Sequence, residues 1–305
     1  MSNGIYETVL TFPDPDAQKR YAELVGLDAT KERLEKESEV LLRPDLLEAW
    51  SKEHHGGRIG ALDDLLTRPP LFIFEGDVGT GKTELSMSFG DPLARAIKGE
   101  VQLFSLSLRA RGQGHVGEMT TLIADAVKTF LTQCPKLPAH GKKPVGAAIL
   151  LIDEADAIAQ SREAAQMHHE DRAGVNALIR GIDDIGRGKL AGLIVLCTNR
   201  VSQLDPAIRR RAAAVFHFKR PNFEMRLKVL HNHLAGTGLA EKDLAEIAEA
   251  LGETKGCDYG YTFSDIRQRV IPSLVLEAYP KHKITKALAL KVIEANPPTA
   301  PFTAE

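Results

Sequence analysis

The chain has 305 residues, enough for one large domain or two smaller ones, and its 43% hydrophobic and 26% charged residues are typical of a soluble protein. A formal net charge of −2 gives no overall positive field to attract nucleic acid, and no apolar run approaches the roughly 20 residues of a membrane span. The N-terminus lacks a basic segment followed by an apolar one, so we expect a cytoplasmic protein with no membrane partner.

The cysteines do not form the pattern of a disulfide framework. They are odd in number and widely spaced, at Cys134, Cys197 and Cys257, and no C-x-x-C pair is present for zinc. We therefore expect a reducing compartment and no structural metal.

Apolar, strand-like runs alternate with helical patterns through the first two-thirds of the chain. The strand-like runs are 71–74, 101–106, 147–152, 193–197 and 215–218, and the helical stretches are 83–97, 118–132, 172–183 and a short turn at 206–210. This alternation predicts an α/β fold in which helices cover both faces of a parallel sheet. The run 147–152 is apolar throughout, as expected for a central strand buried on both faces.

The pattern becomes purely helical after Arg220-Pro221. We expect helices at 223–234, 241–251, 264–278 and 285–295. The predicted organisation is an N-terminal extension (1–20), an α/β domain (21–220), a small all-helical lid domain (221–296) and a flexible tail (297–305). The extension is too short to bury a core of its own.

Residues 76–83 read GDVGTGKT and match G-x-x-x-x-G-K-[ST], the phosphate-binding loop, between a predicted strand and a predicted helix. The glycines allow backbone N–H groups to point at phosphates, and the helix N-terminus adds the positive end of its dipole. We expect Lys82 to reach the β- and γ-phosphates and the Thr83 hydroxyl to bind Mg²⁺. The alternative is an ordinary glycine-rich turn between strand and helix, without a phosphate-binding function. The predicted nucleotide-binding set is Asp77, Val78, Gly79, Thr80, Gly81, Lys82, Thr83 and Glu84.

An acidic pair, Asp153-Glu154, ends the central predicted strand. Ligands of open parallel sheets bind at the carboxyl ends of the strands, so this pair is expected beside the phosphate loop. Asp153 is suited to holding Mg²⁺ and Glu154 to polarising a water that attacks the γ-phosphate. Taken alone, the pair would more often be a helix N-cap.

Two further polar segments follow the next strand. Asn199 lies just past its end, where its amide can bond the attacking water or the γ-phosphate, although Asn also commonly forms turns there. The run Arg209-Arg210-Arg211 follows Leu204-Asp205, and arginine is suited to stabilising a phosphoryl group in transfer. A solvated surface is the alternative for the arginines.

Together these segments resemble the AAA+ ATPases, from about Tyr21 to Ala295. The resemblance implies that residues 76–83 are Walker A, that 149–154 are Walker B and that Asn199 is sensor 1. It also implies that Val25 and Gly26 contact adenine. The arginine fingers, supplied in trans to a neighbouring subunit, fall at Arg210 and Arg211, with Arg209 less favoured.

The sensor 2 position is left open by the resemblance. One register places Ser264 there, as in members that lack the arginine, and another places Arg267 there. Arg267 and Arg269 are alternatively surface charges of a helix.

The segments 175–183 and 264–272 further resemble the pachytene-checkpoint AAA+ ATPases, in a bacterial member. This implies an ATPase with ATP and Mg²⁺ that forms a hexameric ring and remodels a HORMA-domain protein by pulling a flexible segment through its pore. Bacterial relatives act beside HORMA proteins and signalling nucleotidyltransferases in antiviral defence. The predicted pore loop carries His115 and Val116 where the family has aromatic residues, and an ordinary glycine-rich surface loop is the alternative.

Two other functions compete with this one. A DNA-handling AAA+ ATPase, such as a loader or a transposition helper, would need a basic groove with aromatic residues, and the chain has one Trp and five Tyr. A nucleotide-gated scaffold without turnover is disfavoured because Lys82, Asp153 and Glu154 are all present.

Overall fold

The computed structural model describes residues 4–108, 118–137, 146–156 and 169–301. By its internal contacts the chain divides into two compact units, each described here by itself. The domain boundaries expected from the sequence remain a prediction. The first unit comprises Met1–Glu23, Ala29–Glu75 and Thr83–His217, and the second comprises Leu24–Asp28, Gly76–Lys82 and Phe218–Glu305.

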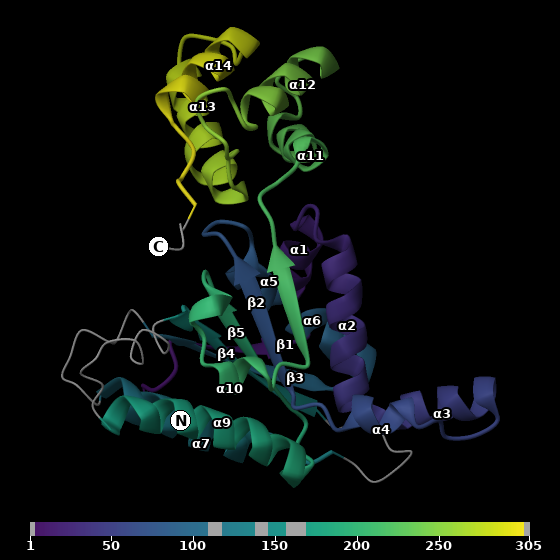
Figure 1. Cartoon of the computed structure of the whole chain (residues 1–305). Coiled ribbons are helices and arrows are strands. Elements are labelled where there is room, and N and C mark those ends of the chain that lie inside the picture. Colours follow the sequence, from purple (N-terminus) through teal and green to yellow (C-terminus); the bar gives the residue numbers. More distant parts are fainter. Residues whose placement is uncertain (1–3, 109–117, 138–145, 157–168, 302–305) are drawn as a thin grey trace. The chain divides into compact units, whose positions relative to one another are not determined.

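A six-stranded mixed sheet with the strand order β1-β3-β4-β5-β2-β6 organises the fold (Figure 1). Strand β3 is parallel to β4, β4 to β5 and β5 to β2, as the alternating pattern predicted. The strands are β1 (Thr8–Phe12), β2 (Leu71–Gly76), β3 (Glu100–Ser107), β4 (Gly146–Asp153), β5 (Gly192–Thr198) and β6 (Ala214–Phe218).

Strand β1 lies within residues 1–20, the predicted N-terminal extension. It pairs antiparallel with β3, with Phe12 opposite Val101, so the sheet is mixed rather than parallel. Only Phe12 is buried along the strand, because an edge strand presents alternate side chains to water. This weak apolar signal is why the sequence did not reveal the strand.

The register of the parallel strands brings their carboxyl ends to one edge. Asp153 of β4 pairs with Ser107 of β3, and Thr198 of β5 pairs with Glu75 of β2. Every residue of β4 except Asp153 is buried, as expected for the central apolar run. The polar residues that follow β4 and β5 therefore lie at the same edge of the sheet.

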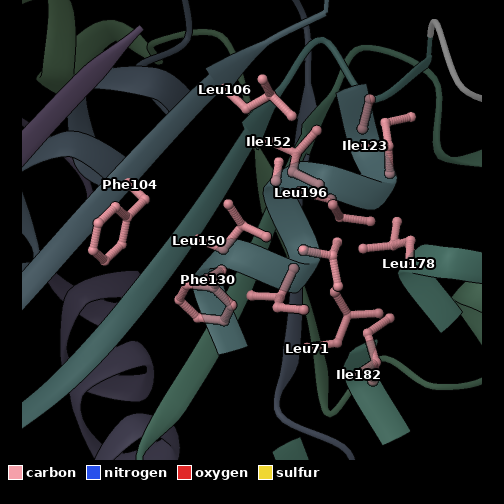
Figure 2. Close-up of a cluster of buried hydrophobic side chains, with 14 of the residues drawn as sticks. Leu71, Phe104, Leu106, Ile123, Phe130, Leu150, Ile152, Leu178, Ile182 and Leu196 are labelled. Carbon is pink, nitrogen blue, oxygen red and sulfur yellow. The ribbon is translucent and has the colours of Figure 1, made fainter. Parts of the chain in front are cut away.

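One face of the sheet packs under α7 (Glu118–Gln133) and α9 (His169–Gly188), which lie side by side (Figure 1). Alternate strand residues supply this core, including Leu150 and Ile152 of β4, and Phe130 and Leu178 contribute from the helices (Figure 2). The intervening strand residues are also buried, on the opposite face. That face includes Phe12, which lies against Gly90 at the start of α6 (Gly90–Ile97).

Further helices lie outside the elements that the sequence predicted. Polar patterns with few apolar residues gave no clear signal between residues 21 and 70. The elements that the sequence did not predict are α1 (Pro15–Glu23), α2 (Asp28–Leu42), α3 (Pro44–His55), α4 (Ala61–Leu66) and η1 (Val201–Gln203). The predicted helical stretch 83–97 is divided into α5 (Lys82–Ser88) and α6, and the predicted turn at 206–210 contains α10 (Pro206–Arg209).

The second unit has its own core of helices. Asn222 caps the first helix by accepting from the Met225 amide at 2.9 Å, and Tyr261 is buried in the core with its hydroxyl donating to the Ile293 carbonyl at 2.8 Å. The helices are α11 (Phe223–Leu234), α12 (Glu241–Ala250), α13 (Ile271–Ala278) and α14 (Lys286–Ala295).

The expected helix over 264–278 is divided. Its first part is a π-helical segment, η2 (Asp265–Val270), in which the Ile271 amide donates to the Ile266 carbonyl five residues back. Pro272 follows at the start of α13 and has no N–H to donate. Proline interrupts the ordinary i to i−4 ladder, so the wider turn precedes it.

Candidate functional site

The phosphate loop forms a compact backbone cradle around one ammonium group. Lys82 is 7% exposed, and its Nζ donates to the carbonyls of Gly76, at 2.6 Å, and of Asp77, at 2.8 Å. The Thr80 hydroxyl donates to the same Asp77 carbonyl at 2.7 Å. These bonds fix the position of the lysine, as a loop prepared to receive phosphate oxygens requires.

Glycine is required at Gly79 for two reasons. Its φ is +78°, in the left-handed region, and a Cβ there would lie 2.7 Å from Ser264 Cβ and from Thr262 Oγ1. The Ser264 amide also donates to the Gly79 carbonyl at 3.1 Å. The start of the sensor 2 region thus lies against the Walker A loop inside the second unit.

The sensor 2 assignment remains open between Ser264 and Arg267. Arg267 is exposed on η2, and Arg269, the other arginine of that segment, bonds Asp265 at 2.9 Å. The assignment of Arg267 to nucleotide binding remains a prediction.

The segment that is predicted to contact adenine packs against the helical core. Val25 packs on that core, and Gly26, with a φ of +73°, leaves space that the Met225 side chain fills. Leu27 Cδ1 lies 3.7 Å from the Cβ position of Gly81, so the segment also lies next to the phosphate loop. A base bound beside the loop would have apolar side chains within reach, which fits the predicted role of Val25 and Gly26.

In the first unit, Thr83 and Asp153 form the expected pair of oxygen donors. The Thr83 hydroxyl, one residue after Lys82 on α5, donates to Asp153 Oδ2 at 2.8 Å. The other carboxylate oxygen, Oδ1, accepts from the Glu154 amide at 2.8 Å. Two hard oxygen donors at this distance fit a Mg²⁺ ion, which prefers carboxylates, hydroxyls and water.

Glu154 has a backbone conformation that is uncommon for a residue with a side chain. Its φ is +55°, and the next amide, that of Ala155, donates to the Cys197 carbonyl at 2.8 Å. This bond ties the turn after β4 to the end of β5. Left-handed non-glycine residues cost free energy and gather at functional sites, where they direct a side chain.

Asn199 follows at the same edge. Thr198 is buried and its hydroxyl accepts from the Arg200 amide at 3.0 Å, so the chain turns immediately after β5 and leaves Asn199 half-buried at the turn. The sheet therefore brings Asp153, Glu154 and Asn199 to one edge, and their catalytic roles remain predictions.

The three consecutive arginines, Arg209 to Arg211, differ in their exposure and in their hydrogen-bond partners. Arg211 makes two bonds to Asp183 on α9, at 2.9 and 3.2 Å, and a third to the Ala207 carbonyl at 3.1 Å. The Asp183 carboxylate raises the pKa of Arg211 above its ordinary value. Arg209 and Arg210 are exposed.

For the remaining predicted site residues that it describes, the structure gives no contact that bears on nucleotide binding. Val78 is 48% exposed, and Glu84 on α5 lies 3.5 Å from Arg20. The predicted pore-loop residues His115 and Val116 lie outside the described residues. Within the described ranges, no cluster of His, Cys, Asp or Glu is arranged to hold a metal by itself, and no helix is long and apolar enough to cross a membrane.

One residue of this region was missed by sequence analysis. Arg220 lies at 14% side-chain exposure with its Nε donating to Asp77 Oδ2 at 2.8 Å. In the sequence, Arg220 is a charged residue just before the predicted hinge proline, and this position does not indicate which residue it binds.

Residues 72–220 match the model of the family described as ATPase family associated with various cellular activities (AAA). The chain is 48% identical over 298 residues to CD-NTase-associated protein 6 of Escherichia coli (strain MS 115-1), covering 98% of this chain and 96% of that one.

Solved structures agree with this match. A chain of the E. coli MS115-1 HORMA:CdnC:Trip13 complex superposes with a TM-score of 0.88 at 45% identity, covering 99% of this chain and all of the other. The structure of Rhizobiales Trip13 superposes with a TM-score of 0.75 at 43% identity, covering 97% of this chain and all of the other. These similarities extend over almost the whole chain. They show that it belongs to the AAA ATPase family and hydrolyses ATP.

Proposed function

We propose that this ATPase remodels a HORMA-domain protein by pulling a flexible segment of it through a ring of identical subunits. The observation that carries the proposal is the similarity, over 99% of the chain, to a chain of the HORMA:CdnC:Trip13 complex. By the same similarity, the setting is an antiviral system in which the HORMA protein acts with a signalling nucleotidyltransferase.

The chemistry assigned to the chain follows from its own groups. Lys82, held by two carbonyls, directs its remaining hydrogen-bonding capacity at the β- and γ-phosphates. Thr83 and Asp153 would hold Mg²⁺, which supplies charge neutralisation of the phosphate oxygens when bound. Glu154 accepts a proton from the attacking water, and Asn199 orients that water.

A neighbouring subunit completes this site. We assign the trans arginine finger to Arg210, because it is exposed whereas Arg211 is committed to Asp183 within its own subunit. An arginine supplied by a neighbour makes hydrolysis depend on assembly. A closed ring supplies every site with such a neighbour, and we propose a hexamer.

A substrate trap tests the remodelling function. Glu154→Gln keeps the backbone and the size of the side chain but removes the base, so this variant should bind ATP and retain its HORMA-domain substrate during affinity purification. A HORMA variant without its flexible terminal segment should not be retained. The matched control is Glu253→Gln, at an exposed position of the second unit, which should hydrolyse ATP and release the substrate.

Two results would contradict the proposal. Undiminished turnover in Glu154→Gln would remove the assigned base. Retention of DNA instead of a HORMA protein, with binding that weakens steeply as salt rises, would favour the DNA-handling alternative.

A further inference from the structure

The Walker A loop of this chain carries a carboxylate, Asp77, next to its first glycine. A phosphate-binding loop works by presenting positive partial charge to an anion, and a negative side chain within it opposes that task. Asp77 is also close to the phosphate-binding lysine, because its own carbonyl accepts from Lys82 Nζ at 2.8 Å. An anion held by Lys82 would then lie within about one screening length, ~8 Å at physiological salt, of this carboxylate.

Arg220 meets this carboxylate directly. Its Nε donates to Asp77 Oδ2 at 2.8 Å, with side-chain exposures of 14% for Arg220 and 24% for Asp77. Such limited exposure leaves the pair less screened than a surface ion pair, so the charges interact more strongly than the exposed pairs of this protein.

The guanidinium is itself fixed by other parts of the second unit. Its Nη1 donates to the Gly260 carbonyl at 2.6 Å, and its plane lies over the Tyr259 ring at 5.1 Å. The planar fork of arginine allows one side chain to bond Asp77 and Gly260 together. These three contacts give Arg220 a defined position beside the phosphate loop.

We propose that Arg220 is a positioning residue for nucleotide binding that neutralises Asp77 and so makes an acidic residue compatible with the phosphate loop. It acts through Asp77, whose carbonyl also holds Lys82 and Thr80. Without Arg220 the negative charge of Asp77 is no longer balanced by this guanidinium, and it repels the bound phosphates. The inference rests on nucleotide binding by the family and not on the HORMA substrate.

A double-mutant cycle in the full chain separates this role from simple packing. The probe is a fluorescent (mant) ADP, whose dissociation constant is measured for Arg220→Gln, Asp77→Asn and the double variant. Arg220→Gln should weaken binding about tenfold, Asp77→Asn by less than about threefold, and the double variant should bind like Asp77→Asn. Rescue by the second substitution is expected only if the repelling charge of Asp77 causes the defect.

Three further readouts sharpen the test. The defect of Arg220→Gln should shrink as salt is raised, and Arg220→Lys, which keeps the charge, should retain most of the affinity. In steady state, Arg220→Gln should raise KM for ATP with little change in kcat. The matched control is Lys286→Gln, which breaks the exposed pair with Glu246, 2.7 Å long, in the same unit and should leave the dissociation constant unchanged.

A double variant that binds as weakly as Arg220→Gln, at unchanged thermal stability, would overturn the inference. So would wild-type affinity in Arg220→Gln. A HORMA protein that is not remodelled would refute the proposed function and leave this inference standing, because mant-ADP binding does not require the substrate.

Discussion

Truncation of Arg211 should lower the stability of the fold, whereas truncation of the adjacent Arg210 should lower the rate of ATP hydrolysis. Arg211→Ala removes the two bonds to Asp183, whose side-chain exposures of 31% and 24% place the pair between a surface and a buried one. We expect a loss of about 1 kcal/mol of folding free energy, since exposed pairs contribute less and buried charged hydrogen bonds more. Arg187, 3.9 Å from Asp183, keeps the loss from being larger.

Arg210→Ala should leave stability unchanged because the side chain is exposed. If Arg210 reaches the γ-phosphate of a neighbour, its loss should lower kcat by about 10³-fold, the lower end of the range for arginine fingers. Urea unfolding of each variant, together with the ATPase rate, measures both effects.

Mixing variants tests whether the arginine acts in trans. Glu154→Gln subunits lack the base but offer Arg210, and Arg210→Ala subunits lack the finger but keep the base. Each preparation alone should be inactive, and an equimolar mixture should recover turnover at interfaces that combine a native Glu154 with a native Arg210. A mixture that stays inactive although mixed assemblies form would refute action in trans. A stable Arg211→Ala with the large kcat defect would reverse the assignment of the two residues.

Asp153→Asn should keep the fold, weaken the Mg²⁺ dependence of nucleotide binding and lower ATPase activity at least about tenfold, measured by titrating Mg²⁺. Gly79→Ala should impair nucleotide binding because of its φ of +78° and the 2.7 Å approach to Ser264, whereas Gly57→Ala, in open space, is the control and should bind normally. Burial raises the pKa of Tyr261 to about 12. Because the pKa of this phenol is higher in the folded than in the unfolded chain, it stabilises the fold below about pH 10, and this contribution declines as the pH rises from there. Tyr261→Phe should therefore lower the free energy of unfolding by about 1 kcal/mol at pH 7. In urea unfolding the variant should also lose less stability at alkaline pH than the original protein. Burial likewise raises the pKa of Cys134 to about 12, so a thiol reagent at pH 8 should modify it only after unfolding, and rapid labelling of the native protein would contradict this.

Features that depend on consecutive residues could be predicted from the amino-acid sequence. The phosphate loop, the acidic end of the apolar strand and the alternation of strands with helices each depend on local spacing, and backbone geometry makes that spacing readable. The predicted parallel arrangement places the carboxyl ends of β4 and β5 at one edge of the sheet, as their parallel pairing shows.

The long-range partners of these residues became visible in the folded chain. Strand β1 is found by pairing with β3, not by its own weak apolar pattern. The run of arginines looks uniform in sequence, yet Asp183 binds Arg211 from 28 residues away, and Asp77 binds Arg220 from 143 residues away. Such contacts form between segments that are distant in the sequence and adjacent in the fold, so no local pattern predicts them. They distinguish the charged residues that stabilise the fold from those that we expect to act on the nucleotide.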